Sequence, residues 1–284
     1  MDNQIGGRKH IMFVMFPGFG VTKPGWDHCI EKNKIIKTNF ITELKKMGTI
    51  FFHEPLYHNI PYYDRENKFK ILYDKNINFT KDNFDVIKEC DKLYLEIKDF
   101  NGMFIPIGHS IGSYFVYCFE QKYKSRCLFS VIIDGSPLGP IKQTLNDEKL
   151  LYSKIKKYKK YDDNMIDIVK EKVYKCDIKA VKKLLDIAFY NIFTYKKITN
   201  KATKFNKPMI GFYNIQIEED SNNKKKNMDH FYNVNRIKEI EYFKKYNNNY
   251  RAITFINKTH YPHDIKESRD IILDSIKQMV NQYS

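Results

Sequence analysis

The sequence lacks the features that would place it in a membrane, outside the cell or around a metal. Its first residues, MDNQIGGRKH, have no apolar core of a signal peptide, and no stretch reaches the roughly 18 apolar residues that span a bilayer. The five cysteines are scattered and form no C-x-x-C pair, which argues against a zinc site or a disulfide framework. We therefore expect a cytoplasmic protein with reduced thiols, no metal and no cofactor.

Arginine is also scarce, with only 6 among the 49 basic residues of a chain whose net charge is +15. A basic surface attracts nucleic acid. Nucleic-acid recognition, however, favours arginine for its bidentate hydrogen bonding. The abundant Lys, Asn, Ile, Tyr and Phe are instead typical of proteins from A+T-rich genomes. We expect no specific nucleic-acid partner. Of the functions considered for this chain, binding to nucleic acid or another anionic surface is the least favoured.

The chain is long enough for one large domain with an insertion. Short apolar runs alternate with amphipathic helical patterns, which is typical of βαβ units and a parallel sheet. The predicted strands are 11–16, 49–53, 103–107, 128–133, 208–217 and 251–256, and the main predicted helices are 38–47, 82–99, 113–119 and 265–280. The pattern predicts an α/β protein with about six mostly parallel strands flanked by helices.

The pattern changes after the fourth predicted strand. Residues 141–205 have no strand-like run, and amphipathic stretches such as 180–192 indicate helices. Residues 142–204 contain 17 Lys against 8 Asp and Glu, so much of the positive charge lies here. We expect a helical insertion at 141–205 within a core made of 1–140 and 206–284.

The run MFIPIGHSIG, which begins at Met103, carries the most chemical information. An apolar strand leads into G-H-S-I-G and then into an apolar helix. Gly108, Ser110 and Gly112 occupy the three fixed positions of the G-x-S-x-G motif, in which a serine sits on a strained strand-to-helix turn. Glycine is needed on both sides because a Cβ there would collide with neighbouring chain. We call this turn, Gly108–Gly112, the elbow, and the pattern makes Ser110 a candidate nucleophile.

Together with PGFG after the first strand and THYPHD after the last, this order of elements resembles the α/β-hydrolase superfamily over nearly the whole chain. The resemblance implies the α/β-hydrolase fold, a nucleophilic Ser110 and a helical cap at 141–205. It also implies a base in the loop before the last helix. His260 occupies that place, with Thr259 where the family usually has Gly, and His263 is the neighbouring alternative. His109 in the elbow is expected to be structural.

The resemblance further implies an oxyanion hole built from two backbone N–H groups. One is the amide of Ile111, directly after the nucleophile, and the other is that of Phe19 in PGFG. Gly18 and Gly20 would let this loop approach a substrate closely. Pro17 stands where many members have His, and main-chain donors tolerate that exchange.

Several residues are candidates for the acid that would orient the histidine. Asp229 fits best, because a helical pattern follows it and His260 lies 31 residues later. The alternatives are Asp134 after the fourth predicted strand, and three acids after 208–217: Glu218, Glu219 and Asp220.

We interpret the chain as a serine hydrolase that cleaves a carboxylic ester or thioester, with a small or lipid-like acyl substrate. Amide cleavage, C–C cleavage and acyl transfer stay open, because they use the same residues. A hydrolase fold that has lost catalysis and serves as a binding module is the alternative.

Overall fold

The computed structural model describes residues 10–18, 26–31, 34–53, 62–63, 69–70, 86–110, 112–135, 207–215, 225–256 and 261–284. The chain divides into two compact units. The first contains Met1–His53, Ile87–Gly139 and Thr203–Ser284, and the second contains Glu54–Val86 and Pro140–Ala202. The predicted helical cap at 141–205 lies outside the described residues. The sequence did not assign 54–86 to a second unit.

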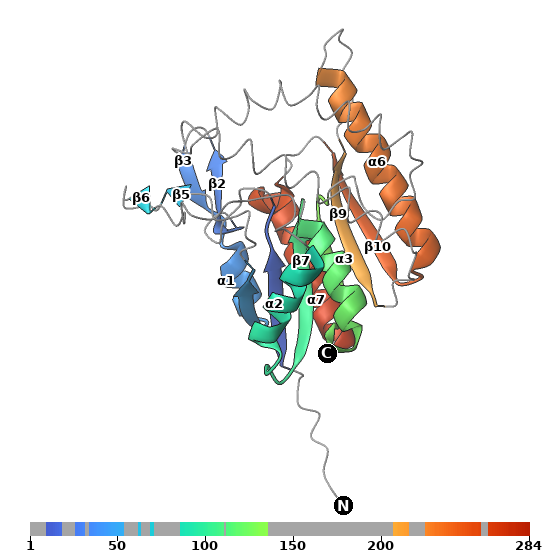
Figure 1. Cartoon of the computed structure of the whole chain (residues 1–284). Helices are drawn as coiled ribbons and strands as arrows, with labels where there is room; N and C mark the ends of the chain where they lie inside the picture. The colour runs from blue at the N-terminus through green and yellow to red at the C-terminus, as the bar shows by residue number, and fades with distance from the viewer. Residues whose placement is uncertain are drawn as a thin grey trace, which may run out of the picture. The chain divides into compact units, whose positions relative to one another are not determined.

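A six-stranded sheet forms the centre of the first unit, in the order β10-β9-β8-β7-β1-β4 (Figure 1). All five strand pairs are parallel. The strands are β1 (Ile11–Phe16), β4 (Thr49–Phe52), β7 (Met103–His109), β8 (Ser130–Ile133), β9 (Met209–Ile215) and β10 (Tyr250–Ile256). The predicted number, place and parallel direction of the strands are therefore confirmed.

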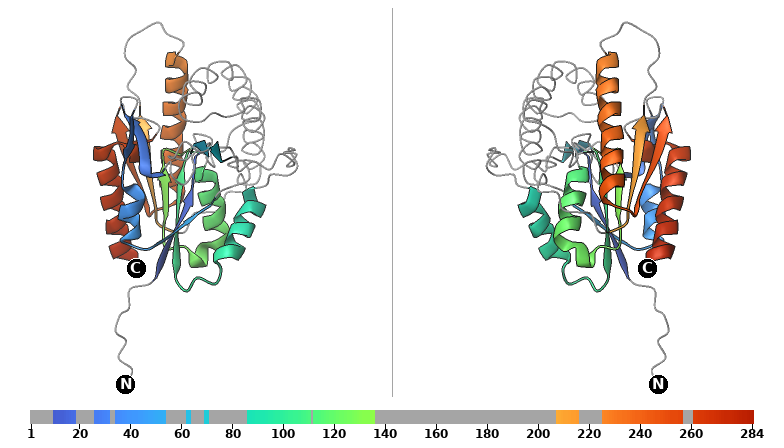
Figure 2. Two further views of the ribbon diagram at one scale, coloured as in Figure 1. Left: turned by 90° about the vertical axis from the view of Figure 1, so that its left-hand side faces the viewer. Right: turned by 90° about the vertical axis from the view of Figure 1, so that its right-hand side faces the viewer.

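Helices cover both faces of this sheet (Figure 2). They are α1 (Phe40–Lys45), α2 (Val86–Ile97), α3 (Gly112–Tyr123), α6 (Lys225–Tyr246) and α7 (Lys266–Tyr283). Helices α1 and α7 lie on one face, and α2 and α3 lie on the other. Helix α6 packs against β9 and β10 and is joined to α3 by a hydrogen bond from Tyr117 to Glu239. No helix within the ranges given above is long and apolar enough to cross a membrane.

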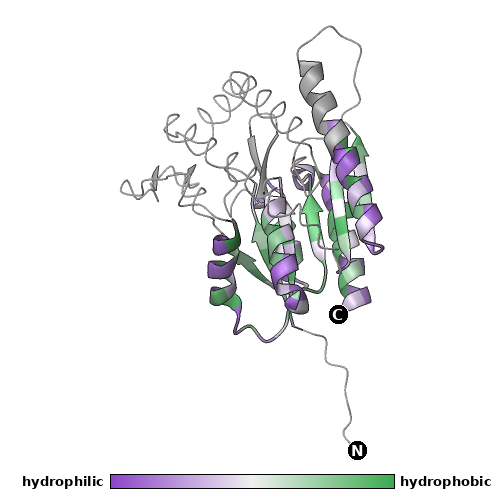
Figure 3. Ribbon diagram, turned by 45° about the vertical axis from the view of Figure 1, so that its right-hand side comes forward, coloured by the Kyte–Doolittle hydropathy of each residue, from purple (hydrophilic) through white to green (hydrophobic). Residues whose placement is uncertain are grey.

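The side chains of β1 alternate between the two faces, as a buried parallel strand requires. Phe13 and Met15 join the core cluster that contains residues of α1 and α7. Phe16 turns to the other face, where its ring stacks on Phe115 of α3 at 5.6 Å between centroids. Figure 3 shows the resulting arrangement, with hydrophobic strands between helices that are hydrophilic in part. Apolar burial on both faces thus holds the strand ends, and the residues that follow them, in fixed places.

Two short antiparallel hairpins lie outside the central sheet and were not predicted. Strand β2 (His28–Glu31) pairs with β3 (Lys34–Lys37) in the first unit. In the second unit, β5 (Tyr62–Tyr63) pairs with β6 (Phe69–Lys70). The connection between β2 and β3 reads Lys-Asn in the sequence, without the glycine that commonly marks a tight hairpin.

Candidate active site

Ser110 lies at the carboxyl edge of the sheet, between the end of β7 and the start of α3. Its backbone has a φ of 51°, in the left-handed region that non-glycine residues rarely adopt. Its N–H donates to Ile133 O of β8 at 3.1 Å, and its carbonyl accepts from the Ser113 N–H at 3.1 Å. Such strained conformations cluster at functional sites because the surrounding structure has to hold them. The strand, the turn and the helix predicted around Ser110 are all present.

The two glycines of the motif leave no room for a side chain. A Cβ on Gly112 would lie 2.1 Å from the Phe16 carbonyl oxygen, and one on Gly108 would lie 2.7 Å from the Gly112 carbonyl oxygen. Both obstacles are backbone atoms, which cannot rotate away. The glycines therefore allow the first turn of α3 to press against the end of β1.

The PGFG segment begins directly beside the nucleophile. A Cβ on Gly18 would lie 3.1 Å from the Ser110 Cβ and 2.5 Å from His109 Nδ1. Strands β1 and β7 are neighbours in register up to Phe16 and Gly108, which explains why the two following turns meet. Phe19 and Ile111, the predicted oxyanion-hole residues, lie outside the described residues.

The loop after β10 also reaches the elbow. His260 lies outside the described residues, but Tyr261, the next residue, packs its ring against His109 with centroids 4.8 Å apart. The neighbour of the predicted base thus contacts the neighbour of the predicted nucleophile. These two positions are 152 apart in the sequence, so only the fold brings them together.

His109 and His263 both have the surroundings of core residues. His263 is completely buried in the 3₁₀ helix η4 (Pro262–Asp264), and its ring lies 5.0 Å from Trp26 and 5.7 Å from Phe40. His109 is buried and lies 5.0 Å from His263. Aromatic packing on several sides favours a structural role for both rings, which is the role expected for His109 and which argues against His263 as the base.

The candidate acids are placed differently. Helix α6 begins at Lys225, so Asp229 lies inside the helix and not in the loop before it. Residues 218–220 lie outside the described residues. Asp134 directly follows β8 and is completely buried, with a φ of 42°. Continuing the register of β7 and β8 by one residue places Asp134 beside Ser110.

Asp134 belongs to a closed ring of hydrogen bonds that the sequence did not reveal. Arg236 of α6 donates through one guanidinium nitrogen to Asp134 Oδ2 at 2.6 Å and through the other to the Asn214 carbonyl at 2.8 Å. The Asn214 N–H closes the ring by donating to Asp134 Oδ1 at 2.9 Å. Because Asp134 and Arg236 are 102 residues apart, no local pattern could have found this ion pair.

Solved structures with a similar fold exist, although the sequence matches no protein-family model and no curated protein. The peroxisomal alpha-beta-hydrolase Lpx1 from Saccharomyces cerevisiae superimposes over 98% of this chain and 77% of its own, with a TM-score of 0.52 and 12% identity. The chain has the α/β-hydrolase fold. A thermophilic esterase from Thermogutta terrifontis is similar over 98% of this chain and 92% of its own (TM-score 0.58, 11% identity). Human thioesterase 2 is similar over 96% and 97% (TM-score 0.50, 13% identity).

The likeness in these comparisons is one of fold, because one α/β-hydrolase scaffold can support many different reactions. Activity therefore has to follow from the residues at the carboxyl edge of the sheet. Among the residues that the structure describes, no group of three or more His, Cys, Asp or Glu side chains could hold a metal ion.

Next to the Asp134–Arg236 pair, the α/β-hydrolase core buries a second carboxyl group. Glu239 is completely buried, and its Oε1 accepts from the Tyr117 hydroxyl at 2.9 Å and the Tyr213 hydroxyl at 3.0 Å. Burial raises the pKa of Glu239 to about 7, against the lowering effect of these two hydrogen bonds and of Arg236. The negative charge of the Asp134 carboxylate also raises the pKa of Glu239.

Glu239 should therefore make stability depend on pH. Its pKa is about 7 in the folded chain and about 4.5 in an unfolded one, so its contribution to stability is greatest below pH 4.5 and is lost as pH rises through 7. The loss amounts to about 3 kcal/mol. We expect the unfolding free energy of Glu239→Gln, relative to wild type, to rise by about that amount between pH 4.5 and pH 8. Urea unfolding at both pH values measures it.

A matched control lies on the same helix. Glu241 is exposed, and Glu241→Gln should shift the unfolding free energy by a similar small amount at both pH values. A Glu239→Gln effect that is the same at both pH values would contradict the assignment of a raised pKa to this carboxyl.

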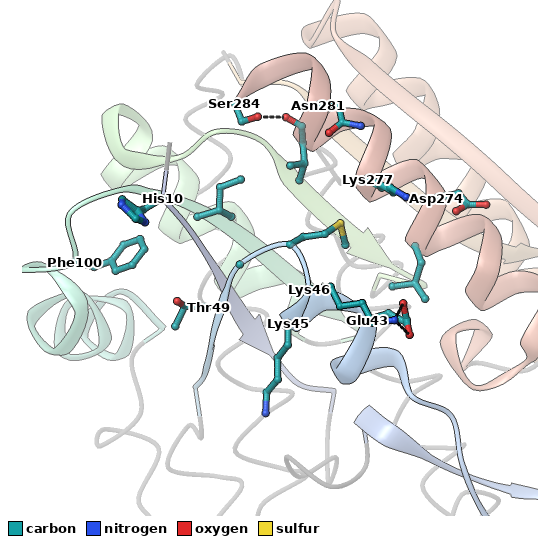
Figure 4. A pocket seen from close by; sticks show the side chains of 15 residues that line it. His10, Glu43, Lys45, Lys46, Thr49, Phe100, Asp274, Lys277, Asn281 and Ser284 are labelled. Carbon is teal, nitrogen blue, oxygen red and sulfur yellow. Dashed lines mark hydrogen bonds and ion pairs between the residues drawn. The ribbon is translucent and has the colours of Figure 1, made fainter. Parts of the chain in front are cut away.

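A pocket of about 800 Å³ opens at the opposite edge of the sheet (Figure 4). It is lined by residues that precede β1, β4 and β7 and by α1 and the last turns of α7, among them His10, Gly48, Phe100 and Lys277. Strands of a parallel sheet share one carboxyl edge, so this pocket lies at the other end of the strands from Ser110. Its lining includes none of the predicted catalytic residues.

Proposed function

We propose that the chain is a serine hydrolase that cleaves a carboxylic ester or thioester through an acyl-enzyme on Ser110. The observation that carries the proposal is the strained backbone of Ser110 at the carboxyl edge, with both Gly18 and Tyr261 against the elbow. An exposed serine becomes a useful nucleophile only when a base and an oxyanion hole are within reach. Gly18 and Tyr261, the described neighbours of Phe19 and His260 in the sequence, support this assignment because both lie against the elbow.

In the proposed reaction, His260 removes the proton from the Ser110 hydroxyl as its oxygen attacks the substrate carbonyl. The backbone N–H groups of Phe19 and Ile111 stabilise the negative charge on the carbonyl oxygen. His260 then protonates the leaving alcohol or thiol, and the acyl group stays on Ser110. A water molecule, deprotonated by His260, attacks the ester and releases the acid.

Asp229 is the proposed acid that holds His260 and stabilises its charged form. Asp134 is a weaker candidate, because both of its oxygens already accept hydrogen bonds from Asn214 and Arg236. The buried packing of His263 likewise supports His260 as the base.

The proposal is tested by hydrolysis of a short-chain nitrophenyl ester and of an acyl thioester, followed from pH 5 to pH 9. Wild type should turn over at least one of them, with a rate that rises as the base loses its proton near neutral pH. His260→Gln should lower kcat by at least about 1,000-fold. An exposed histidine at the other end of the sheet supplies the control, and His10→Gln should stay within about twofold of wild type.

Full activity in His260→Gln would remove His260 from the mechanism. No turnover of either substrate class by folded wild type would favour the alternative, in which the α/β-hydrolase fold serves as a binding module.

A further inference from the structure

The inner face of α6 is unusual because its middle part buries charge. The buried positions Asn233, Arg236, Glu239 and Phe243 follow one another at helical spacing. Burying a charged side chain is costly unless its partners are well placed. Apolar residues at both 134 and 236 would hold the helix on the sheet without this cost, so the buried pair calls for another explanation.

The partners of Arg236 lie next to the nucleophile. Ser110 donates its N–H to Ile133 O, and Asp134 is the residue that follows Ile133. The Asp134 N–H in turn donates to Phe212 O of β9 at 2.6 Å. Main-chain hydrogen bonds and the ring through Arg236 therefore connect the elbow, the ends of β8 and β9, and α6.

The same hydrogen-bonded ring joins the two ends of the segment that contains most of the candidate acids. Asn214 near the end of β9 and Arg236 in α6 are joined directly, and the 21 residues between them contain Asp229 and the acids at 218–220. The remaining candidate, Asp134, is itself in the ring. Asp229 lies seven residues before Arg236 in α6, about two turns or 10 Å along the axis. A bidentate guanidinium fixes both the height and the rotation of such a helix, because its fork has one favourable orientation.

We propose that Arg236 is a positioning residue of the active site: by joining α6 to Asp134 and to the end of β9, it sets the place of the acid that orients His260. This inference rests on the proposed hydrolase function. It holds for each candidate acid, because each lies in the ring or in the segment that the ring closes.

Arg236→Lys tests the inference, since lysine keeps the charge and loses the fork. We expect kcat to fall by about 10- to 100-fold while KM changes less than threefold, as for a catalytic group displaced by about 1 Å. The acidic limb of the pH profile of kcat/KM should also move to lower pH, because a misplaced acid stabilises the imidazolium less. A purely structural arginine would not move that limb.

Arg126 provides the matched control at the other end of the sheet. It donates to the carbonyls of Lys98, Phe100 and Gly102 and lies far from the elbow along the strands. Arg126→Lys should lower the unfolding midpoint and leave kcat and the pH profile unchanged. Asp134→Asn is the second variant, because its amide has a single acceptor oxygen and must turn an N–H donor toward either the Arg236 guanidinium or the Asn214 N–H; opening the ring in this way should lower kcat in the same direction as Arg236→Lys.

Three results would overturn the inference. One is a wild-type kcat and pH profile in folded Arg236→Lys and Asp134→Asn. Another is a loss of activity that equals the fraction of the variant that is unfolded. The third is failure of both variants to fold. Either of these would mean that the hydrogen-bonded ring serves stability alone. If wild type shows no Ser110-dependent hydrolysis, the proposed function fails and this inference with it.

Discussion

Ser110→Ala should lower kcat/KM for the ester or thioester by at least about 1,000-fold. Without the hydroxyl no acyl-enzyme can form, and the amides of the oxyanion hole and substrate binding supply the residual rate alone. The backbone at Ser110 is held by its bonds to Ile133 and Ser113, which alanine keeps, so folding should be preserved. Steady-state kinetics together with near-UV circular dichroism measure both outcomes.

Ser275→Ala is the control for this change. The Ser275 hydroxyl is exposed and donates within α7 to the Ile271 carbonyl, so its loss should leave the kinetics of wild type. Hydrolysis that persists in folded Ser110→Ala would show that another group performs the chemistry.

Gly112→Ala should lower the free energy of unfolding by about 3 kcal/mol or prevent folding. Inside a helix, alanine is favoured over glycine by about 1 kcal/mol, so helix propensity alone predicts stabilisation. At Gly112 the added Cβ would instead lie 2.1 Å from the Phe16 carbonyl oxygen and 2.8 Å from that of Pro17. Relief would require α3 to move away from β1, which would disturb the elbow as well.

Urea unfolding of Gly112→Ala and of Gln121→Ala in the same helix tests this prediction. Gln121 is partly exposed, and its replacement should change the unfolding free energy by less than about 0.5 kcal/mol. A Gly112→Ala variant as stable as wild type would show that the end of β1 does not press on the elbow.

The central sheet was predictable because its signals are local. Most of the strands contain an apolar run that covers much of their length, as Ile11–Phe16 and Met103–His109 illustrate. The elbow was predictable for the same reason, since Gly108, Ser110 and Gly112 lie within five positions and each has a steric or chemical requirement. A parallel direction then follows from the intervening helices.

The parts that escaped prediction depend on long-range contacts or weak turn signals. The start of α6 at Lys225 lies in a polar stretch, SNNKKKN, whose composition resembles a loop. The ion pair of Asp134 and Arg236 joins residues far apart in the chain, and neither residue shows its partner in its local sequence. For this reason the nucleophile could be named from sequence, whereas the acid stays a choice among several residues.

Covalent labelling with a fluorophosphonate, located by peptide mass spectrometry, tests the central claim most directly. Such a probe reacts with serines that are activated by a base and an oxyanion hole. We predict one adduct, on the peptide that contains Ser110, which is absent in Ser110→Ala and slowed in His260→Gln but not in His10→Gln. Folded wild-type protein that carries no adduct on Ser110, or the same low labelling on several serines, would contradict the assignment of Ser110 as an activated nucleophile.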